Sequence, residues 1–543
     1  MNAKETQTTA SSQSKMLRGS AWMTAGSIFS RVLGAIYIIP WWAWLGSAAL
    51  AANGLFTKGY QIYGVFIIIS TAGIPSAVAK QIAHYNAMSE YATSIRLWWH
   101  GMIATSILGV ISAAILWFAA PLLAAGDSRM IPVFHSLAWA ILVIPMLSIM
   151  RGYFQGVSDM APSAISQLVE QFVRVIYMLA SVYFIMKMGN GDYILAVTHS
   201  TFAAFIGALA GILMLVAIFI RRWPRIRAQM AHSANQIDVS VNQLLMDIAR
   251  QAIPFIIMDS AINWYYIIDQ YTYKPMWGHL FNWSVNHMND LYALYAGNAN
   301  KLIMIVVSLA SAMGITVIPL LSAAVTRHEM HDVSRQMTNA IQLFSIVMIP
   351  ASLGMMAIAQ PLYVVFYGYD GTGIRMLEVS CILAVALGLY TVLAALLQGV
   401  FRNRLAIMLM LVGIVVKVVL QYPLSALFGA YGPMLASLAG LGVNSILMLR
   451  KLWQYYHFKV FQTSRRVAGM LFFGSLMFAV VRIAMWLMNY FIPAVSKPGA
   501  VAELIVALIL GGGVYGYLVL KTHLADMILG GRVAGIRRIL HMQ

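Results

Sequence analysis

The chain has 543 residues, of which 61% are hydrophobic and only 10% are charged, whereas about a quarter of the residues of a soluble domain are charged. This composition excludes a single soluble domain and indicates many membrane-spanning helices. Lys and Arg outnumber Asp and Glu by 35 to 17. Because these basic residues fall in short loops between apolar runs, they indicate membrane topology rather than nucleic-acid binding. The single cysteine, Cys381, excludes an intramolecular disulfide and a cysteine metal cluster.

The first 18 residues are polar and lack the apolar core of a signal peptide, so they are expected to form a cytoplasmic tail. Fourteen apolar runs follow, each with the roughly 20 residues that a membrane crossing needs. In chain order these runs cover residues 19–44, 60–83, 99–124, 131–152, 163–188, 194–220, 248–270, 299–325, 337–367, 375–401, 404–428, 431–453, 467–493 and 500–522. The longest polar interruption separates the sixth run from the seventh and is the natural boundary between two halves.

The charge distribution predicts the orientation of these helices. An even number of spans places both termini on one side of the membrane, where 23 of the 35 Lys and Arg residues fall, against 7 on the opposite side. By the positive-inside rule, both termini are expected to be cytoplasmic. The predicted parts are a cytoplasmic tail (1–18), a six-helix lobe (19–221), a cytoplasmic linker (222–247), a second six-helix lobe (248–456), a helix pair (457–523) and a cytoplasmic tail (524–543).

The two predicted lobes show signs of an internal repeat. "ISTAGI" (69–74) recurs as "ASAMGI" 241 residues later, and "FQGV" (154–157) recurs as "LQGV" 243 residues later. The second offset places Arg174 on Lys417, so two rare intramembrane cations fall in equivalent helices. Parallel repeats of this kind predict two bundles of the same orientation and suit transport by alternating access.

Five basic residues lie inside the predicted spans, where a charge costs about 2.5–3.5 kcal/mol on insertion scales and is expected to face protein or water. They are Arg31, Arg174, Arg250, Lys417 and Arg482. Arg31 lies 12 residues after Gly19, or about 18 Å along a helix, which is too deep for easy contact with the cytoplasmic surface. A cation lining a polar cavity is therefore favoured over a purely structural ion pair.

The acids near these cations leave several alternatives open. Glu170 and Arg174 are spaced i, i+4, which fits a self-neutralised pair and a role in a cavity equally. Lys417 has no acid in its own span, so its partner must come from another helix or from a ligand, and a ligand is favoured. Asp259 in the seventh span fits a counter-ion to Arg31 or a site for a coupling cation.

The remaining intramembrane acids are interpreted as structural. Asp269 and Glu378 are expected at the interface, whereas Glu503 is expected to pair with Arg482 in the C-terminal helix pair. The interior therefore carries a surplus of cations, which suits an anionic cargo such as a phosphate or pyrophosphate. Neither a Walker A pattern nor an HExxH zinc motif is present, so no cofactor is predicted.

Three stretches carry a resemblance to a known family. They are "GSAWMTAGSIFSRVLGAIYIIPWW" (19–42), "GYQIYGVFIIISTAGIPSAVAKQIAHYN" (59–86) and "RGYFQGVSDMAPSAISQLVEQFVRV" (151–175). The chain resembles the lipid-linked oligosaccharide flippases of the MOP superfamily, and most closely the MurJ/YtgP/SpoVB group of Gram-positive bacteria, which flips the peptidoglycan precursor lipid II. The resemblance implies an all-α, V-shaped protein of the bacterial cell membrane, with a cationic central cavity and a C-terminal helix pair that holds the polyprenyl tail.

The resemblance also implies roles for individual residues. Arg31 matches a functional cavity arginine of the family, but the second arginine and acid found six residues further in better-known members are Tyr37 and Ile38 here. Some relatives have a sodium site with acids in the seventh and eleventh spans. This chain has Asp259 in the seventh span and no acid in the eleventh, which argues against sodium coupling.

The resulting hypothesis is a flippase, not an enzyme, that moves undecaprenyl-pyrophosphate-linked lipid II from the inner to the outer leaflet. Arg31, Arg174 and Lys417 are expected to bind the pyrophosphate, with Glu170 beside them. The expected partners are lipid II, membrane lipid and the cell-wall synthesis machinery, with no nucleic acid. A coupling cation or the membrane potential, worth about 2.3 kcal/mol per charge per 100 mV, is expected to drive the step.

Three other functions remain as alternatives. A flippase for a capsule or teichoic-acid unit would use the same architecture and the same cations. A MATE-type multidrug exporter would more often carry acids to hold cationic drugs, so the surplus of buried cations speaks against it. A membrane-embedded glycosyltransferase or phosphatase would need clustered acids or a His/Arg signature at one membrane face, and the sequence shows neither.

Overall fold

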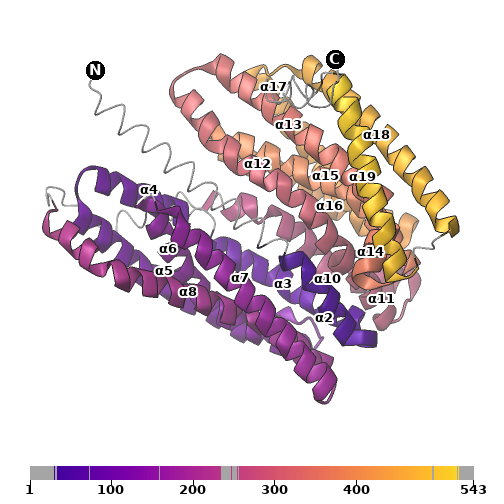
Figure 1. Cartoon of the computed structure of the whole chain (residues 1–543), viewed down its shortest axis with the longest axis horizontal. Coiled ribbons are helices and arrows are strands. Elements are labelled where there is room, and N and C mark those ends of the chain that lie inside the picture. The colour runs from indigo at the N-terminus through magenta and orange to yellow at the C-terminus, as the bar shows by residue number, and fades with distance from the viewer. Residues whose placement is uncertain are drawn as a thin grey trace. The chain divides into compact units, whose positions relative to one another are not determined.

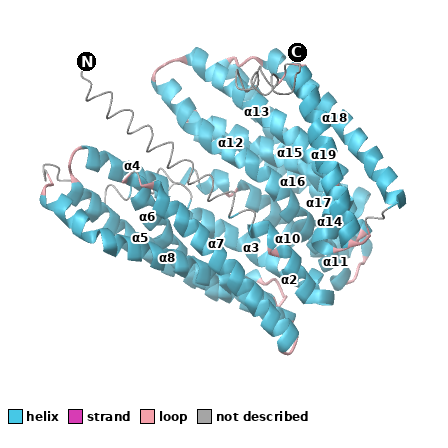
Figure 2. Cartoon of the chain, in the orientation of Figure 1, coloured by secondary structure: helices cyan, strands magenta, loops and turns pink. Residues whose placement is uncertain are grey.

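The computed structural model describes residues 30, 33–71, 74–157, 159–233, 246, 253–254, 256–491, 495–522 and 524. Within these ranges the protein is built of helices and short connections, and no strand is present (Figure 2). Eleven segments of the described part are long and apolar enough to cross a membrane. One of them, Asn403–Tyr456, covers two of the runs predicted from the sequence. The all-helical membrane fold is thus confirmed, and the eleven segments are compatible with fourteen crossings.

The chain divides into two compact units, Met1–Asn263 and Trp264–Gln543. Figure 1 follows their helices by colour along the chain. The first unit contains α2 (Ile38–Leu45), η1 (Gly46–Ala48), α3 (Ala49–Thr71), α4 (Ile74–Ala87), α5 (Tyr91–Leu123), α6 (Met130–Gly156), α7 (Met160–Tyr183), η2 (Phe184–Met188) and α8 (Tyr193–Ala231). Helix α8 extends beyond the predicted span through "RRWPRIRAQMA", because arginine and alanine continue a helix well outside the membrane.

Helix α10 (Ala261–Phe281) crosses the boundary between the units. The second unit continues with α11 (Val285–Tyr292), η3 (Ala293–Ala299), α12 (Asn300–Thr326), α13 (Met330–Ala357), α14 (Ala359–Tyr367), α15 (Gly371–Gly399), α16 (Asn403–Phe428), η4 (Gly429–Tyr431), α17 (Gly432–Tyr456), α18 (Val460–Phe491) and α19 (Lys497–Lys521). The segment η3 is a π-helix, a form that is frequent at functional sites, and all seven of its residues are buried.

Several helices begin at a polar side chain that accepts hydrogen bonds from the first free backbone N–H groups. Asp192 accepts from Ile194 and Leu195 at the start of α8, and Asp370 accepts from Gly373 at the start of α15. Such caps satisfy donors that the helix itself leaves unpaired, and each contributes about 1 kcal/mol. These two caps fix the residues at which α8 and α15 begin.

Glycines allow the closest helix contacts in both units. A Cβ atom added to Gly207 of α8 would lie 2.6 Å from the carbonyl oxygen of Glu170 and 2.9 Å from Cβ of Arg174. In the second unit, a Cβ atom on Gly440 of α17 would lie 2.5 Å from the carbonyl oxygen of Gly413 on α16. Small residues of this kind let membrane helices approach backbone to backbone. The two contacts position the helices that carry the intramembrane charges.

The ion pair formed by the C-terminal helices differs from the predicted one. Arg482 of α18 pairs with Glu378 of α15 at 2.7 Å, and its guanidinium also donates to the carbonyl oxygen of Ala357. The predicted pair of Arg482 with Glu503 is therefore wrong, because Arg482 faces α15 rather than α19. Glu503 is buried on α19 and only 1% exposed.

Candidate functional site

The predicted substrate-binding residues of the described chain lie in two groups of polar side chains, one in each unit. Arg31, the arginine predicted to line the cavity, lies outside the described residues, as does Arg250. Asp259 is described immediately before α10, and its side chain is exposed. Because Arg31 is not described, the pairing of Asp259 with Arg31 stays a prediction.

In the first unit, Glu170 pairs with an arginine of a neighbouring helix. Nη2 of Arg151 on α6 lies 2.7 Å from Oε2 of Glu170 on α7, and Nε of Arg151 donates to the hydroxyl of Ser166 at 2.9 Å. Both charged side chains are about one-fifth exposed. The self-neutralised pair of Glu170 and Arg174 is thus not observed, because the carboxylate faces α6 instead of the next turn of its own helix.

Arg174 lies against an aromatic surface of α3. Its guanidinium donates a hydrogen bond to the hydroxyl of Tyr60 and lies 5.3 Å from the centre of the Tyr60 ring. Tyr60 in turn stacks on Phe56 at 4.3 Å and meets Tyr63 edge to face at 5.3 Å. Such cation–π contacts stabilise a cation without neutralising it. Within the described residues, no carboxylate lies within ion-pair distance of Arg174, so this half-buried cation is not neutralised by an ion pair there.

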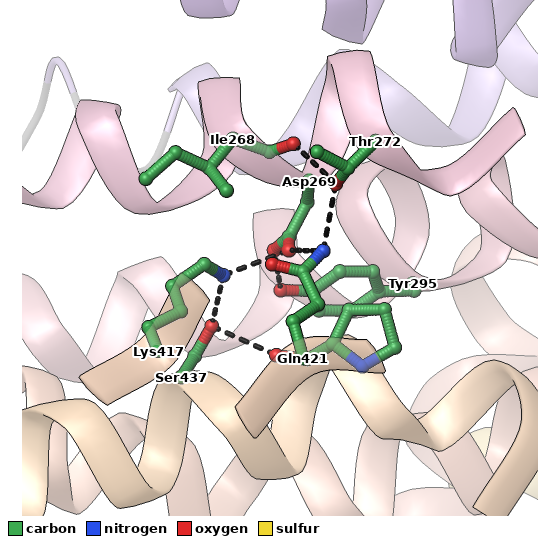
Figure 3. Close-up of polar contacts among 8 residues, drawn as sticks. Ile268, Asp269, Thr272, Tyr295, Lys417, Gln421 and Ser437 are labelled. Carbon is green, nitrogen blue, oxygen red and sulfur yellow. Dashed lines mark hydrogen bonds and ion pairs between the residues drawn. The ribbon is translucent and has the colours of Figure 1, made fainter. Parts of the chain in front are cut away.

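In the second unit, Lys417 of α16 is completely buried and pairs with Asp269 of α10 (Figure 3). The Nζ atom lies 2.7 Å from Oδ1 of Asp269 and 2.6 Å from the hydroxyl of Ser437 on α17. It also lies 5.3 Å from the centre of the Tyr265 ring. The sequence allowed Lys417 a partner on another helix or a ligand. The structure shows a partner on another helix, Asp269 of α10.

Asp269 has two further hydrogen-bond donors. Nε2 of Gln421 donates to Oδ1 at 3.0 Å, and the hydroxyl of Tyr295 donates to Oδ2 at 2.9 Å. Gln421 also donates to Thr272 at 2.8 Å, one turn further along α10 (Figure 3). With three donors and an exposed fraction of 1%, Asp269 is a buried member of a polar network.

This Lys417–Asp269 network joins four segments of the second unit. Asp269 and Thr272 come from α10, Tyr295 from the π-helical η3, Lys417 and Gln421 from α16, and Ser437 from α17. The i, i+4 spacing of Lys417 and Gln421 places both on the face of α16 that meets α10. Sequence reasoning missed Gln421 and Tyr295 because neutral polar residues are common in these spans and carry no signal of their own.

The fold and its intramembrane charges define a multi-pass membrane protein of the transporter type. Residues 16–325 match the family described as "Polysaccharide biosynthesis protein". The chain is 32% identical over 544 residues to "Lipid II flippase MurJ" of Bacillus subtilis (strain 168), covering 97% of this chain and 98% of the relative. It therefore belongs to the polysaccharide biosynthesis protein family, together with this MurJ relative.

The chain is also similar to another curated protein and to solved structures. The "Uncharacterized membrane protein YabM" of Bacillus subtilis (strain 168) is 24% identical over 511 residues, covering 93% of this chain and 92% of the relative. Among solved structures, an inward-facing MATE family transporter of the MOP superfamily superposes with a TM-score of 0.61 at 16% identity, covering 81% of this chain and 95% of that one. A lipid II flippase MurJ in an inward closed conformation gives 0.58 at 11% identity, with coverages of 92% and 99%. These structural matches show the fold alone, and they agree with the all-helical membrane fold expected from the sequence.

Proposed function

We propose that this protein is a flippase that moves lipid II, the undecaprenyl-pyrophosphate-linked peptidoglycan precursor, from the inner to the outer leaflet. The observation that carries this proposal is the 32% identity to the lipid II flippase MurJ of Bacillus subtilis along almost the full length of both chains. An identity that extends over all the membrane helices supports a common cargo better than a match of isolated motifs. The protein acts as a transporter, not as an enzyme.

In this proposal, Arg31 and Arg174 bind the pyrophosphate. Arginine suits this task because its planar guanidinium forms two parallel hydrogen bonds to phosphate oxygens. The pairing of Glu170 with Arg151 supports the assignment of Arg174, since within the described part of the chain it leaves the Arg174 guanidinium without an acid in ion-pair distance and in contact with the ring and hydroxyl of Tyr60. Glu170 thus acts indirectly, by holding Arg151 away from the Arg174 surface.

Lys417 has a different role in the proposal. Because its ammonium is completely buried and paired with Asp269, it contacts a substrate only in a state in which this pair has opened. In the described state it holds α10, α16 and α17 together. Asp259 remains the candidate for a counter-ion to Arg31 or for a site that binds a coupling cation.

The proposal includes the orientation of the chain in the membrane and the energy source for transport. Both termini are cytoplasmic, the six-helix lobes cover 19–221 and 248–456, and the helix pair 457–523 accompanies the polyprenyl tail. Transport by alternating access exposes the head group first to the cytoplasm and then to the outside. A negative-inside membrane potential drives the anionic head group outward with about 2.3 kcal/mol per charge per 100 mV. The cell-wall synthesis machinery on the outer face then consumes the flipped lipid.

Complementation of a depleted strain tests the residue assignments. Arg31→Ala and Arg174→Gln are expected to insert normally and to fail in lipid II flipping. Arg129→Gln is the matched control, because Arg129 lies in the loop between α5 and α6, where it pairs with Asp127. Transport at the wild-type rate by both cavity variants would contradict the proposal.

A second candidate is a flippase for another polyprenyl-linked glycan, which the description of the matching family as a polysaccharide biosynthesis protein favours. It would use the same pyrophosphate-binding arginines. The lipid that accumulates on the cytoplasmic face after depletion distinguishes the two, since only the first candidate predicts lipid II.

A further inference from the structure

A cavity of about 420 Å³ lies between the start of α7 and residues 218–222 of α8. Its floor is apolar and its rim carries two adjacent arginines. It is lined by Ala161, Pro162, Ile165, Ile218, Arg221 and Arg222. The volume falls within the range of about 300–1,000 Å³ that is usual for ligand pockets.

The two arginines at the rim differ in their partners. Arg222 forms an ion pair with Asp159, the residue before α7, and lies 5.7 Å from the centre of the Phe154 ring. Arg221 is exposed, and no acid of the described chain lies within ion-pair distance of it. The Asp159 carboxylate also forms no capping hydrogen bond to α7. The rim therefore holds one neutralised guanidinium and one that is available to an anion.

The surroundings of the cavity indicate the depth of a membrane interface. Trp98 of α5 stacks on Phe219 of α8 at 4.6 Å, and Phe219 contacts Trp223 at 5.6 Å. Trp99 and Trp223 are 58% and 40% exposed. Tryptophan is enriched where lipid headgroups meet the acyl region, and here it flanks the point at which α8 changes from apolar to basic.

We propose that this cavity binds an anionic phospholipid, with the phosphate at Arg221 and Arg222 and the start of an acyl chain on the floor formed by Ile165 and Ile218. The combination of an apolar floor and a cationic rim fits a lipid better than free phosphate, which would leave the floor uncovered. Basic pockets between membrane helices bind anionic headgroups in this way. The proposal concerns a structural lipid and does not depend on the identity of the transported cargo.

Native mass spectrometry of the purified full-length protein tests the site. Phosphatidylglycerol is expected to bind in preference to phosphatidylethanolamine of the same chain length. In the double variant Arg221→Gln/Arg222→Gln, affinity for phosphatidylglycerol is expected to fall at least fivefold, since an unpaired basic residue near an anionic lipid contributes about fivefold and Arg222 is already paired with Asp159. The control variant Arg225→Gln/Arg227→Gln removes two cations further along the same helix and is expected to retain binding.

Two single variants test the site while keeping both arginines of the rim. Asp159→Asn frees Arg222 and is expected to tighten binding of phosphatidylglycerol, whereas Ile218→Trp fills the floor and is expected to weaken it. Equal losses in the two double variants would overturn the site, because they would show a nonspecific charge effect. Displacement of the lipid by millimolar inorganic phosphate would identify a phosphate site and overturn the assignment to a lipid.

Discussion

Replacing Lys417 by Met removes the cation from the buried network while keeping a long apolar stem. Asp269 would then remain at 1% exposure without the ammonium that lies 2.7 Å from its carboxylate. Removing one partner of a buried ion pair costs about 3–5 kcal/mol, because an uncompensated charge is left behind. Since Tyr295 and Gln421 still donate to Asp269, we expect the lower end of this range, about 3 kcal/mol.

Thermal unfolding of the purified protein in detergent measures this effect. At about 2 °C per kcal/mol for a unit of this size, Lys417→Met is expected to lower the Tm by about 6 °C. The double variant Lys417→Met/Asp269→Asn is expected to recover most of the loss, because neither charge remains in the interior. A Tm for Lys417→Met within about 1 °C of wild type, as for an ordinary surface substitution, would refute the reasoning.

Three further predictions follow from the contacts. Tyr60→Phe removes the hydrogen bond to Arg174 but keeps the ring, so the rate of flipping is expected to fall severalfold while expression is unchanged. A vesicle-based flipping assay measures the rate, and an unchanged rate would contradict a role of this hydrogen bond in transport. Glu170→Gln leaves Arg151 without its carboxylate and is expected to lower the Tm, which an unaltered unfolding curve would disprove. Gly440→Ala forces α16 and α17 apart and is expected to lower the free energy of unfolding by about 1–3 kcal/mol. In the matched variant Gly442→Ala the added methyl group meets open space, so equal losses of stability in the two variants would exclude a steric cause.

The helices were predictable because hydropathy reports the bilayer directly. Runs such as 99–124 and 404–428 correspond to α5 and α16, whose bounds are Tyr91–Leu123 and Asn403–Phe428. The ends were less predictable, since polar helix turns outside the membrane leave no hydropathy signal, as at the end of α8. The family assignment was also within reach, because the stretches through the first five spans are specific enough to carry it.

The partners of the charges were not predictable from spacing. An i, i+4 pair such as Glu170 and Arg174 is visible in the sequence, but the packing of α6 against α7 gives the carboxylate to Arg151 instead. Similarly, Lys417 and Asp269 are 148 residues apart, and only the packing of α10 against α16 brings them together. Sequence reasoning identified which residues are unusual in a membrane, whereas tertiary structure decides which of them neutralise each other.

The most direct test of the central claim is the orientation of lipid II in cells depleted of this protein. We predict that lipid II accumulates on the cytoplasmic face, and that the wild-type protein but not Arg31→Ala restores its appearance on the outer face. Normal orientation of lipid II after depletion, in a strain from which other flippases have been removed, would contradict the account.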